Sequence, residues 1–306
     1  MIIYVKESGN IMTSPTISLC MIVRNEEEFI SKCLASIHDL VDELIVIDTG
    51  STDQTMNICQ KYQAAIYPYQ WNDDFSAARN YGLSKASGDW IIWIDADEVL
   101  ESENRQLIRD TISNTKSAMF YLPIINYYGD ALPVETDQAY LYYQPRLFRN
   151  HLGIKFQNKI HEIPKFPESN YTQSTIETIE VPIHHYGYIK EITARKNKSA
   201  RNLQILYQES KTPDHSPWID YHLASEWYRN KDYQRAFNYL NQSIHRFLVQ
   251  GFKPPAILYR LKYEILLETN SIEGALLGID HVLMLYPDYV DLNFIKGLIL
   301  FHKKIS

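Results

Sequence analysis

Along the first hundred or so residues, continuous apolar runs alternate with segments whose apolar residues recur every three to four positions. A short apolar run bounded by turn residues is typical of a strand buried on both faces, whereas the three-to-four spacing indicates an amphipathic helix. The pattern predicts strands over 17–23, 43–48, 65–69 and 90–95, and helices over 26–38, 51–61 and 74–86. Strands and helices that alternate in this way predict a parallel α/β sheet.

Beyond residue 100 the pattern changes twice. A helix is predicted to about residue 113, and short strand-like runs then follow over 118–127, 140–149, 154–162 and 176–185. Pro, Gly and polar residues separate these runs, which predicts an extension of the sheet with long loops. From residue 190 to the end the spacing is helical.

Two groups of residues in the helical tail share one spacing, which matches a helix–turn–helix unit of about 34 residues. The first group is Leu223, Ala224, Trp227, Ala236, Leu240 and Ser243, and the second is Tyr263, Leu266, Ala275, Ile279, Val282 and Pro287. The stretch 292–300 fits the first helix of a third, capping unit. The pattern resembles tetratricopeptide repeats, and a generic helical bundle is the alternative. We therefore predict a poorly ordered leader over 1–15, an α/β domain over 16–189, a helical linker over 190–215 and tetratricopeptide-like repeats over 216–306.

Composition and charge narrow the classes of function. The formal net charge of −7 argues against a nucleic-acid binder, because phosphate backbones require clustered positive charge. No apolar run approaches the roughly 18 residues that span a bilayer, so no integral membrane segment is expected. The three cysteines lack the spacing of metal ligands, and so sparse a set indicates a reducing, cytoplasmic location.

Two aspartates, separated by Ala96, end the apolar run at 90–95. Side chains two apart on an extended strand point the same way, so Asp95 and Asp97 converge beyond the strand end. Converging carboxylates repel each other unless a cation joins them, and oxygen ligands suit Mg²⁺ or Mn²⁺. A metal held there could neutralise a diphosphate. The alternative is that the two aspartates cap a following helix.

Polar residues also follow the first two predicted strands, over 23–26 and 48–51. Ligands of open α/β sheets bind at the carboxyl ends of the strands, which makes both stretches candidate binding loops. Asp48, beside a glycine turn and a helix start, could accept the N3–H of a pyrimidine base. A turn or helix-capping aspartate is the alternative.

The chain resembles glycosyltransferase family 2 in four motifs, which are ISLCMIVRNE at 17–26, IDTGSTD at 47–53, DFSAARN at 74–80 and IDADE at 94–98. Three further motifs are similar to the branch that carries tetratricopeptide repeats, and within it to the sublancin-type peptide S-glycosyltransferases: RLFR at 146–149, IHE at 160–162 and HHYGY at 184–188. The resemblance covers about residues 16–205. It departs at Arg24, where many members have Tyr, and in a shorter helical tail.

The resemblance implies a GT-A fold and an inverting transfer from a nucleotide-sugar. It assigns Asp48 to the uracil, Asp95 to the ribose or the metal, and Asp97 to the metal. His185 would be the other protein ligand, and an imidazole suits Mn²⁺ better than Mg²⁺; a core or surface histidine is the alternative. Arg79 would brace the nucleotide pocket, or else it is a solvated helix position. The remaining nucleotide-binding candidates are Val23, Arg24, Asn25, Glu26, Ser51 and Ala96.

Inversion in one displacement requires a base that takes the proton of the acceptor. Glu162 is the predicted base, with His161 positioning the acceptor or sharing the role, and Glu98 is the rival. A thiol acceptor needs little help, because a few per cent is already thiolate at neutral pH.

A basic stretch follows the last predicted strand. Five cations against one acid give it a net charge of +4, from Lys190, Arg195, Lys196, Lys198 and Arg201 against Glu191. It could close over the diphosphate as a lid, with Lys198 and Arg201 as donor-binding residues. A solvated helix face is the alternative.

The leading hypothesis is metal-dependent transfer of a sugar from a UDP-sugar to the Cys, Ser or Thr side chain of a peptide or protein. Stacked helix pairs often offer a groove for an extended chain, and they could also join two copies in a homodimer. The first alternative is the same chemistry on a cell-envelope glycan or a lipopolysaccharide core sugar. The second is an inactive scaffold that binds partners through its repeats.

Overall fold

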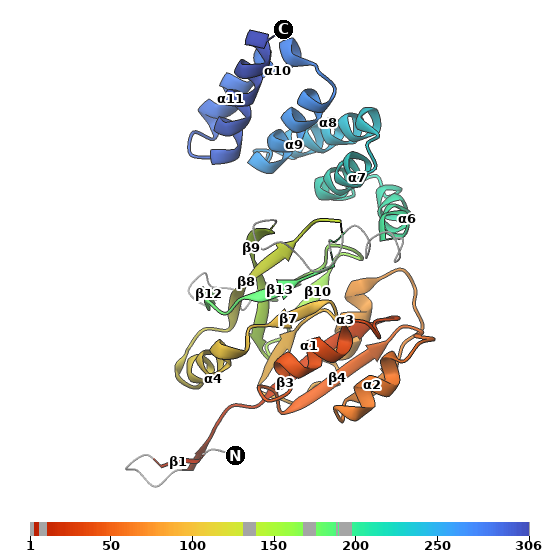
Figure 1. The fold of residues 1–306 in the computed structure, drawn as a ribbon, viewed down its shortest axis with the longest axis vertical. Coiled ribbons are helices and arrows are strands. Elements are labelled where there is room, and N and C mark those ends of the chain that lie inside the picture. Colours follow the sequence, from red (N-terminus) through yellow and green to blue (C-terminus); the bar gives the residue numbers. More distant parts are fainter. Residues whose placement is uncertain are drawn as a thin grey trace. The chain divides into compact units, whose positions relative to one another are not determined.

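The computed structural model describes residues 3–5, 11–130, 139–167, 176–187, 189 and 198–305. The chain divides into two compact units, Met1–Asn197 and Lys198–Ser306, which are described separately (Figure 1). No helix in the described part of the chain is long and apolar enough to cross a membrane.

A nine-stranded sheet forms the centre of the first unit, in the order β5-β4-β3-β6-β9-β8-β13-β7, with β12 beside β8 (Figure 1). Its strands are β3 Ile17–Val23, β4 Glu43–Asp48, β5 Ala65–Pro68, β6 Trp90–Trp93, β7 Glu98–Leu100, β8 Met119–Tyr127, β9 Ala139–Arg149, β12 Ile176–Thr178 and β13 Ile183–His185. The first four strands of that order are parallel, whereas β9 runs antiparallel to both β6 and β8. The predicted parallel sheet and its extension are therefore confirmed.

The two faces of the sheet are covered by different helices because the side chains of each strand alternate between them. The odd-numbered residues of β3, from Ile17 to Val23, join a core with Ile30, Cys33 and Leu34 of α1 (Ile30–Ile37). Cys20 faces the other way, into a core with Ile47 and Trp93 that the partly buried Tyr81 and Leu83 of α3 (Phe75–Leu83) cover. Further cover comes from α2 (Thr55–Lys61) and from α4 (Arg105–Asn114), which follows a short 3-10 turn, η1 (Ser102–Asn104).

Several predicted elements have different bounds in the structure, including the run at 154–162, of which only Lys155–Gln157 is a strand. The run at 176–185 is two strands, since β12 ends at Thr178 and β13 begins at Ile183, after Pro182. The first helix begins at Ile30 rather than at residue 26. The second begins at Thr55, because Asp53 accepts hydrogen bonds from the backbone and hydroxyl of that residue and closes the preceding turn.

Two small hairpins complete the first unit. Strands β1 (Ile3–Val5) and β2 (Ile11–Thr13) pair antiparallel within the predicted leader. Strands β10 (Lys155–Gln157) and β11 (Ile163–Lys165) pair in the same way. The second hairpin matters for the site, because residues 158–162 connect its strands.

The second unit is all helical, with α6 Lys198–Ser210, α7 Pro217–Arg229, α8 Tyr233–Val249, α9 Ala256–Glu268, α10 Ile272–Leu285 and α11 Val290–Ile305. The turn between α7 and α8 recurs between α9 and α10. Asp232 N–H donates to Trp227 O in the first turn (3.0 Å), and Ser271 N–H donates to Leu266 O in the second (2.8 Å). The residue before each donor has a positive φ, 60° at Lys231 and 53° at Asn270.

The small repeat residues lie where helices pack closely. Ala224 and Ala236 are fully buried in one core, and Ala275 is fully buried in the next. These positions fit the predicted repeat pattern. The last helix, α11, packs in the second core through Leu292 and Ile295, and its role as the start of a third unit stays a prediction.

Candidate functional site

The carboxyl ends of β3, β4 and β6 meet at one edge of the sheet. Val23 is directly opposite Asp48 in the register of β3 and β4. The two loops that follow are joined, since Asn25 N–H donates to Ser51 Oγ (3.1 Å) and Thr52 N–H donates to Asn25 Oδ1 (2.8 Å). The structure thus brings the two predicted binding loops together.

Asp48 also stabilises its own loop. Its Oδ1 accepts a hydrogen bond from Ser51 N–H at 2.9 Å, as a turn aspartate would. Gly50 between them has a φ of +104°, and a Cβ there would meet nothing within 4 Å, so the loop borders open space. A turn role and a base-binding role are compatible, because a carboxylate has a second oxygen.

Arg79 connects two acids that are distant in the sequence. From α3 its Nη2 donates to Asp95 Oδ1 (2.9 Å) and its Nε donates to Glu162 Oε1 (2.6 Å). Its side chain is only 8% exposed, and its guanidinium lies 4.1 Å from the centre of the Trp93 ring. The alternative of a solvated helix position is therefore wrong. Burial raises the pKa of Asp95, but Arg79 and then Arg146 outweigh it and hold that pKa below its ordinary value.

Glu162 and His161 lie in the connection between β10 and β11, rather than on a strand as the sequence predicts. Phe75 N–H, at the start of α3, donates to Lys159 O (2.8 Å) and ties this connection to the helix that carries Arg79. The Glu162 side chain is 11% exposed, whereas His161 is exposed and has a positive φ of 54°.

Asp97 and His185 face each other across the turn that follows β6. His185 Nε2 lies 3.5 Å from Asp97 Oδ1, and both side chains are almost buried. Asn126 on β8 holds the ring, because its Nδ2 donates to Ile124 O and its Oδ1 lies 2.7 Å from His185 Nδ1. This places a proton on Nδ1, so Nε2 of a neutral ring presents its lone pair toward the carboxylate. A cation, or a second ring proton, stabilises such a pair.

These two side chains fit a metal ion. Mg²⁺ and similar ions are commonly held by one or two protein ligands together with substrate phosphates. Metal-binding histidines almost always donate their other ring N–H to an acceptor, which is the role of Asn126. In the described part of the chain, no three His, Cys, Asp or Glu side chains gather as a metal cluster. Asp97 and His185 are the facing candidate ligands. Asp95 Oδ1 binds Arg79, so its role as a metal ligand stays a prediction for its second oxygen.

Glu98 is enclosed by the protein. It is 1% exposed, its Oε2 accepts Asp95 N–H (2.8 Å), and its Oε1 accepts from Arg146 Nη2. Burial raises the pKa of Glu98, and Arg146 opposes that shift. A side chain so enclosed cannot reach a substrate, which favours Glu162 as the base.

The basic stretch is only partly described. Lys198 and Arg201 lie on α6 of the second unit, whereas Lys190, Glu191, Arg195 and Lys196 fall outside the described residues. The lid stays a prediction. Val23 and Ala96 are buried, so their backbone alone is available to a ligand, and Arg24 is exposed.

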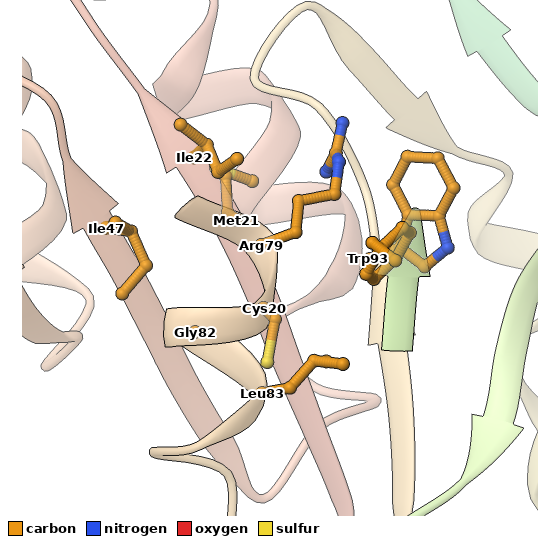
Figure 2. Close-up of a pocket in the computed structure, with 9 residues that line it drawn as sticks. Cys20, Met21, Ile22, Ile47, Arg79, Gly82, Leu83 and Trp93 are labelled. Atoms are coloured by element: carbon orange, nitrogen blue, oxygen red, sulfur yellow. The ribbon is translucent and has the colours of Figure 1, made fainter. Parts of the chain in front are cut away.

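A small pocket lies beneath Arg79, between α3 and strands β3 and β6 (Figure 2). It is lined by Cys20, Met21, Ile22, Ile47, Arg79, Gly82, Leu83, Trp93 and Phe156. Its volume of about 10 Å³ is near that of one water probe, so a nucleotide cannot enter it. The candidate donor site is instead the edge of the sheet at the carboxyl ends of β3, β4 and β6, where the strand-end loops lie.

Sequence reasoning missed three residues that shape this edge: Asn126, Trp93 and Arg146. Arg146 stands in the motif at 146–149, but its type and spacing did not indicate a contact with the aspartates. Asn126 is an ordinary strand residue by pattern, and only the pairing of β8 with β13 brings it opposite His185.

Comparison with known proteins decides the family. The sequence model of Glycosyl transferase family 2 matches residues 18–170, half of the chain. The chain belongs to glycosyltransferase family 2. Membership in this family confirms the resemblance of the motifs, and the sheet described above is the GT-A fold that it implies.

Two relatives in this comparison cover most of the chain. A TPR repeat-containing protein of Synechococcus elongatus is 36% identical over 262 residues, 82% of this chain and 61% of that protein. The SPbeta prophage-derived glycosyltransferase SunS of Bacillus subtilis is 30% identical over 296 residues, 94% of this chain and 67% of that protein. The chain thus spans about three fifths to two thirds of the length of these relatives.

Among solved structures, residues 1–349 of S. aureus TarS in complex with UDP-GlcNAc align at 15% identity with a TM-score of 0.45. The alignment covers 80% of this chain and 83% of that one. A likeness at this level does not bear on the function of this chain.

Proposed function

We propose that this protein transfers a sugar from a UDP-sugar to a peptide or protein, with inversion and with a divalent metal ion. The observation that carries the proposal is the Asp97–His185 pair, whose facing oxygen and nitrogen atoms lie 3.5 Å apart. Membership in glycosyltransferase family 2 supports the chemistry, and the similarity to the glycosyltransferase SunS supports it over nearly the whole chain.

The strand-end residues would bind the donor. Asp48 would accept the uracil N3–H, and Asp95 would bind the ribose or the metal. Asp97 and His185 would hold Mn²⁺ or Mg²⁺, which supplies positive charge at the diphosphate as it leaves. The loops that begin at Val23 and Asp48, with Ser51 between them, would surround the nucleotide.

Glu162 would take the proton of the acceptor, with His161 beside it. Its Oε1 is paired with Arg79 Nε (2.6 Å), so its other oxygen would take the proton. A thiol acceptor needs little help from a base, because part of it is ionised at neutral pH. We therefore propose a Cys side chain ahead of Ser or Thr as the acceptor.

The second unit would bind the acceptor or a second copy of the chain. Stacked helix pairs offer extended concave surfaces, which suit a peptide in an open conformation. We propose the peptide rather than a cell-envelope glycan as the acceptor on this ground. Lys198 and Arg201 would contribute to a lid over the diphosphate.

Release of UDP from UDP-sugars, measured with and without Mn²⁺ and with Cys- or Ser-containing peptides, tests the proposal. We expect metal-dependent turnover and a mass increase of one sugar on the peptide. Asp97→Ala should abolish turnover without unfolding the protein, whereas Asp110→Ala, at an exposed position of α4, should not change it.

Three results would count against parts of the proposal. Transfer to a glycan or lipid without any transfer to peptide would assign the envelope alternative. Turnover that is unchanged by removal of metal would exclude the metal role. Calorimetry that shows no UDP binding in the presence of Mn²⁺ would favour the scaffold, which the intact acids Asp95, Asp97 and Glu162 otherwise argue against.

A further inference from the structure

A buried ion pair lies behind the turn that carries Asp95 and Asp97. Arg146 on β9 is 2% exposed and Glu98 on β7 is 1% exposed, and Arg146 Nη2 donates to Glu98 Oε1. Neither residue can touch a donor or an acceptor. The pair nevertheless binds the turn at residues 94–97, here called the acid turn because it carries Asp95 and Asp97.

Both members of the pair bind the backbone of this turn. Glu98 Oε2 accepts Asp95 N–H at 2.8 Å, and Arg146 Nη1 donates to Trp93 O at 3.3 Å. The pair therefore connects the end of β6 with the start of β7 and sets the path of the backbone between them. Asp97 is the last residue of that path before β7, so the path helps to direct its side chain toward His185.

The Trp93 ring links this pair to the acids of the site. The Arg146 guanidinium lies 3.8 Å from the ring centre and that of Arg79 lies 4.1 Å from it. Trp93 Nε1 also donates to Pro145 O (2.9 Å), next to Arg146, which fixes the indole. A change at Arg146 therefore reaches the side chain that holds Asp95.

Stability alone does not account for the pair. Removing two charges from water costs several kcal/mol per ion, and replacing a buried pair with uncharged residues of similar volume is often neutral or stabilising. In the described part of the chain, Arg146 Nε is buried and has no hydrogen-bond partner, which adds to that cost. The contacts of the pair point instead to the geometry of the turn.

We infer that Arg146 and Glu98 are positioning residues, which hold Asp95 and Asp97 in the arrangement that binds the metal and the nucleotide diphosphate. The inference rests on the proposed function and deepens it. Loss of both charges leaves the fold intact and loosens the acid turn. The affinity for Mn²⁺ and UDP then falls.

The test is the double variant Glu98→Gln with Arg146→Met in the full chain. Calorimetry of UDP binding with saturating Mn²⁺, and titration of Mn²⁺ by its electron paramagnetic resonance signal with saturating UDP, give the two affinities. We expect each Kd to rise by about tenfold or more, which is the size of effect seen when a support of metal ligands is removed. The midpoint of thermal unfolding should stay within a few degrees of the wild type.

A control removes another contact between a buried carboxylate and an arginine, although this arginine is partly exposed. Asp220 is 2% exposed by side chain and accepts from Arg246 Nε at 2.9 Å in the second unit. Asp220→Asn with Arg246→Met should leave both Kd values unchanged. Arg146→Lys keeps the charge but not the two-armed donor, so its Kd values should lie between those of the wild type and the double variant.

Each outcome decides. A double variant that binds UDP and Mn²⁺ like the wild type, or one that fails to fold, would overturn the inference and leave the proposed function standing. A wild type that binds neither ligand would overturn both. In turnover assays of the double variant, the KM for the UDP-sugar should rise more than kcat falls. If part of the enzyme were merely unfolded, kcat alone would fall.

Discussion

Arg79 Nε lies 2.6 Å from Glu162 Oε1, so the predicted base is bound to an arginine before any acceptor arrives. The contact joins α3 to the connection between β10 and β11. Because Glu162 is the proposed base, its replacement should affect oxygen and sulfur acceptors differently.

Glu162→Gln should separate hydroxyl from thiol acceptors. General-base catalysis contributes about 10²- to 10⁴-fold, so kcat on a Ser peptide should fall by about that factor. On a matched Cys peptide the loss should be less than about tenfold, because the thiolate forms without a base. Initial rates at several peptide concentrations measure both, with Glu103→Gln on the exposed surface as the control. Equal losses on the two peptides would contradict the role of a base in this difference.

Asn126→Ala should weaken metal binding without a contact to the metal. Asn126 holds His185 Nδ1 at 2.7 Å, and loss of such a partner typically lowers metal affinity by about 10- to 100-fold. Titration of Mn²⁺ in the presence of UDP measures the effect. Asn126→Asp keeps an acceptor oxygen and should retain more affinity than Asn126→Ala, while Asn114→Ala at the end of α4 is the control. Unchanged affinity in Asn126→Ala would show that the ring needs no support.

Acid should weaken the link between the starts of β3 and β6. Thr16 N–H and Oγ1 donate to Asp89 Oδ2 (2.8 and 2.9 Å), and chiefly the backbone bond lowers the pKa of Asp89 from its ordinary 3.8. A lowered folded-state pKa means a contribution to stability that is complete well above pH 3.8 and is lost as pH falls through the folded-state value. The difference in unfolding free energy between wild type and Asp89→Ala should therefore shrink from pH 7 to pH 3. Urea unfolding at both values measures it, and a constant difference would contradict the assignment.

The three cysteines should not react in the folded protein. Cys20, Cys33 and Cys59 are buried, and burial raises the pKa of Cys20 to about 12 and that of Cys59 to about 11. The thiolate is the reactive form, so labelling by an iodoacetamide reagent at pH 8 should be negligible. The same reagent in guanidinium chloride should label all three, as mass spectrometry will show. Rapid labelling of one site in the native protein would contradict its burial.

Two glycines should respond in opposite directions to an added methyl group. Gly297 lies within α11 and a Cβ there meets nothing within 4 Å, so Gly297→Ala should stabilise the second unit by about 0.5–1 kcal/mol. At Gly88 a Cβ would lie 2.7 Å from Ser18 Oγ and 2.8 Å from Ser18 N, so Gly88→Ala should destabilise by about 1–3 kcal/mol. Chemical unfolding of the two variants measures both values. Equal effects would contradict the packing at Gly88.

Much of the fold could be predicted from the chain because its signals are local. The apolar runs at 17–23 and 90–95, the three-to-four spacing of the helices and the recurring positions of Ala236 and Ala275 are short-range patterns. Each records how one element buries its surface. The strand-end acids Asp48, Asp95 and Asp97 follow from the same reasoning, since parallel strands present their carboxyl ends together.

The partners of these acids could not be predicted in this way. The sequence allowed Arg79 to support the nucleotide pocket or to be a solvated helix position. The packing of α3 against β3 decides between them, because it places the guanidinium between Asp95 and Glu162. From the sequence, Glu98 was a rival candidate for the base. In the structure β7 pairs antiparallel with β13, and Arg146 on β9 encloses Glu98. Asn126 carried no signal at all.

The sequence by itself therefore determined the family, the order of the elements and the acids at the edge of the sheet, because those depend on motifs and on periodicity within single elements. Only the tertiary structure decided which acid faces His185, which is held by Arg79 and which is buried with Arg146. The physical reason is that the strength of a carboxylate as ligand, base or support is set by the charges and donors within a few ångströms of it. Those neighbours come from strands and helices far apart along the chain.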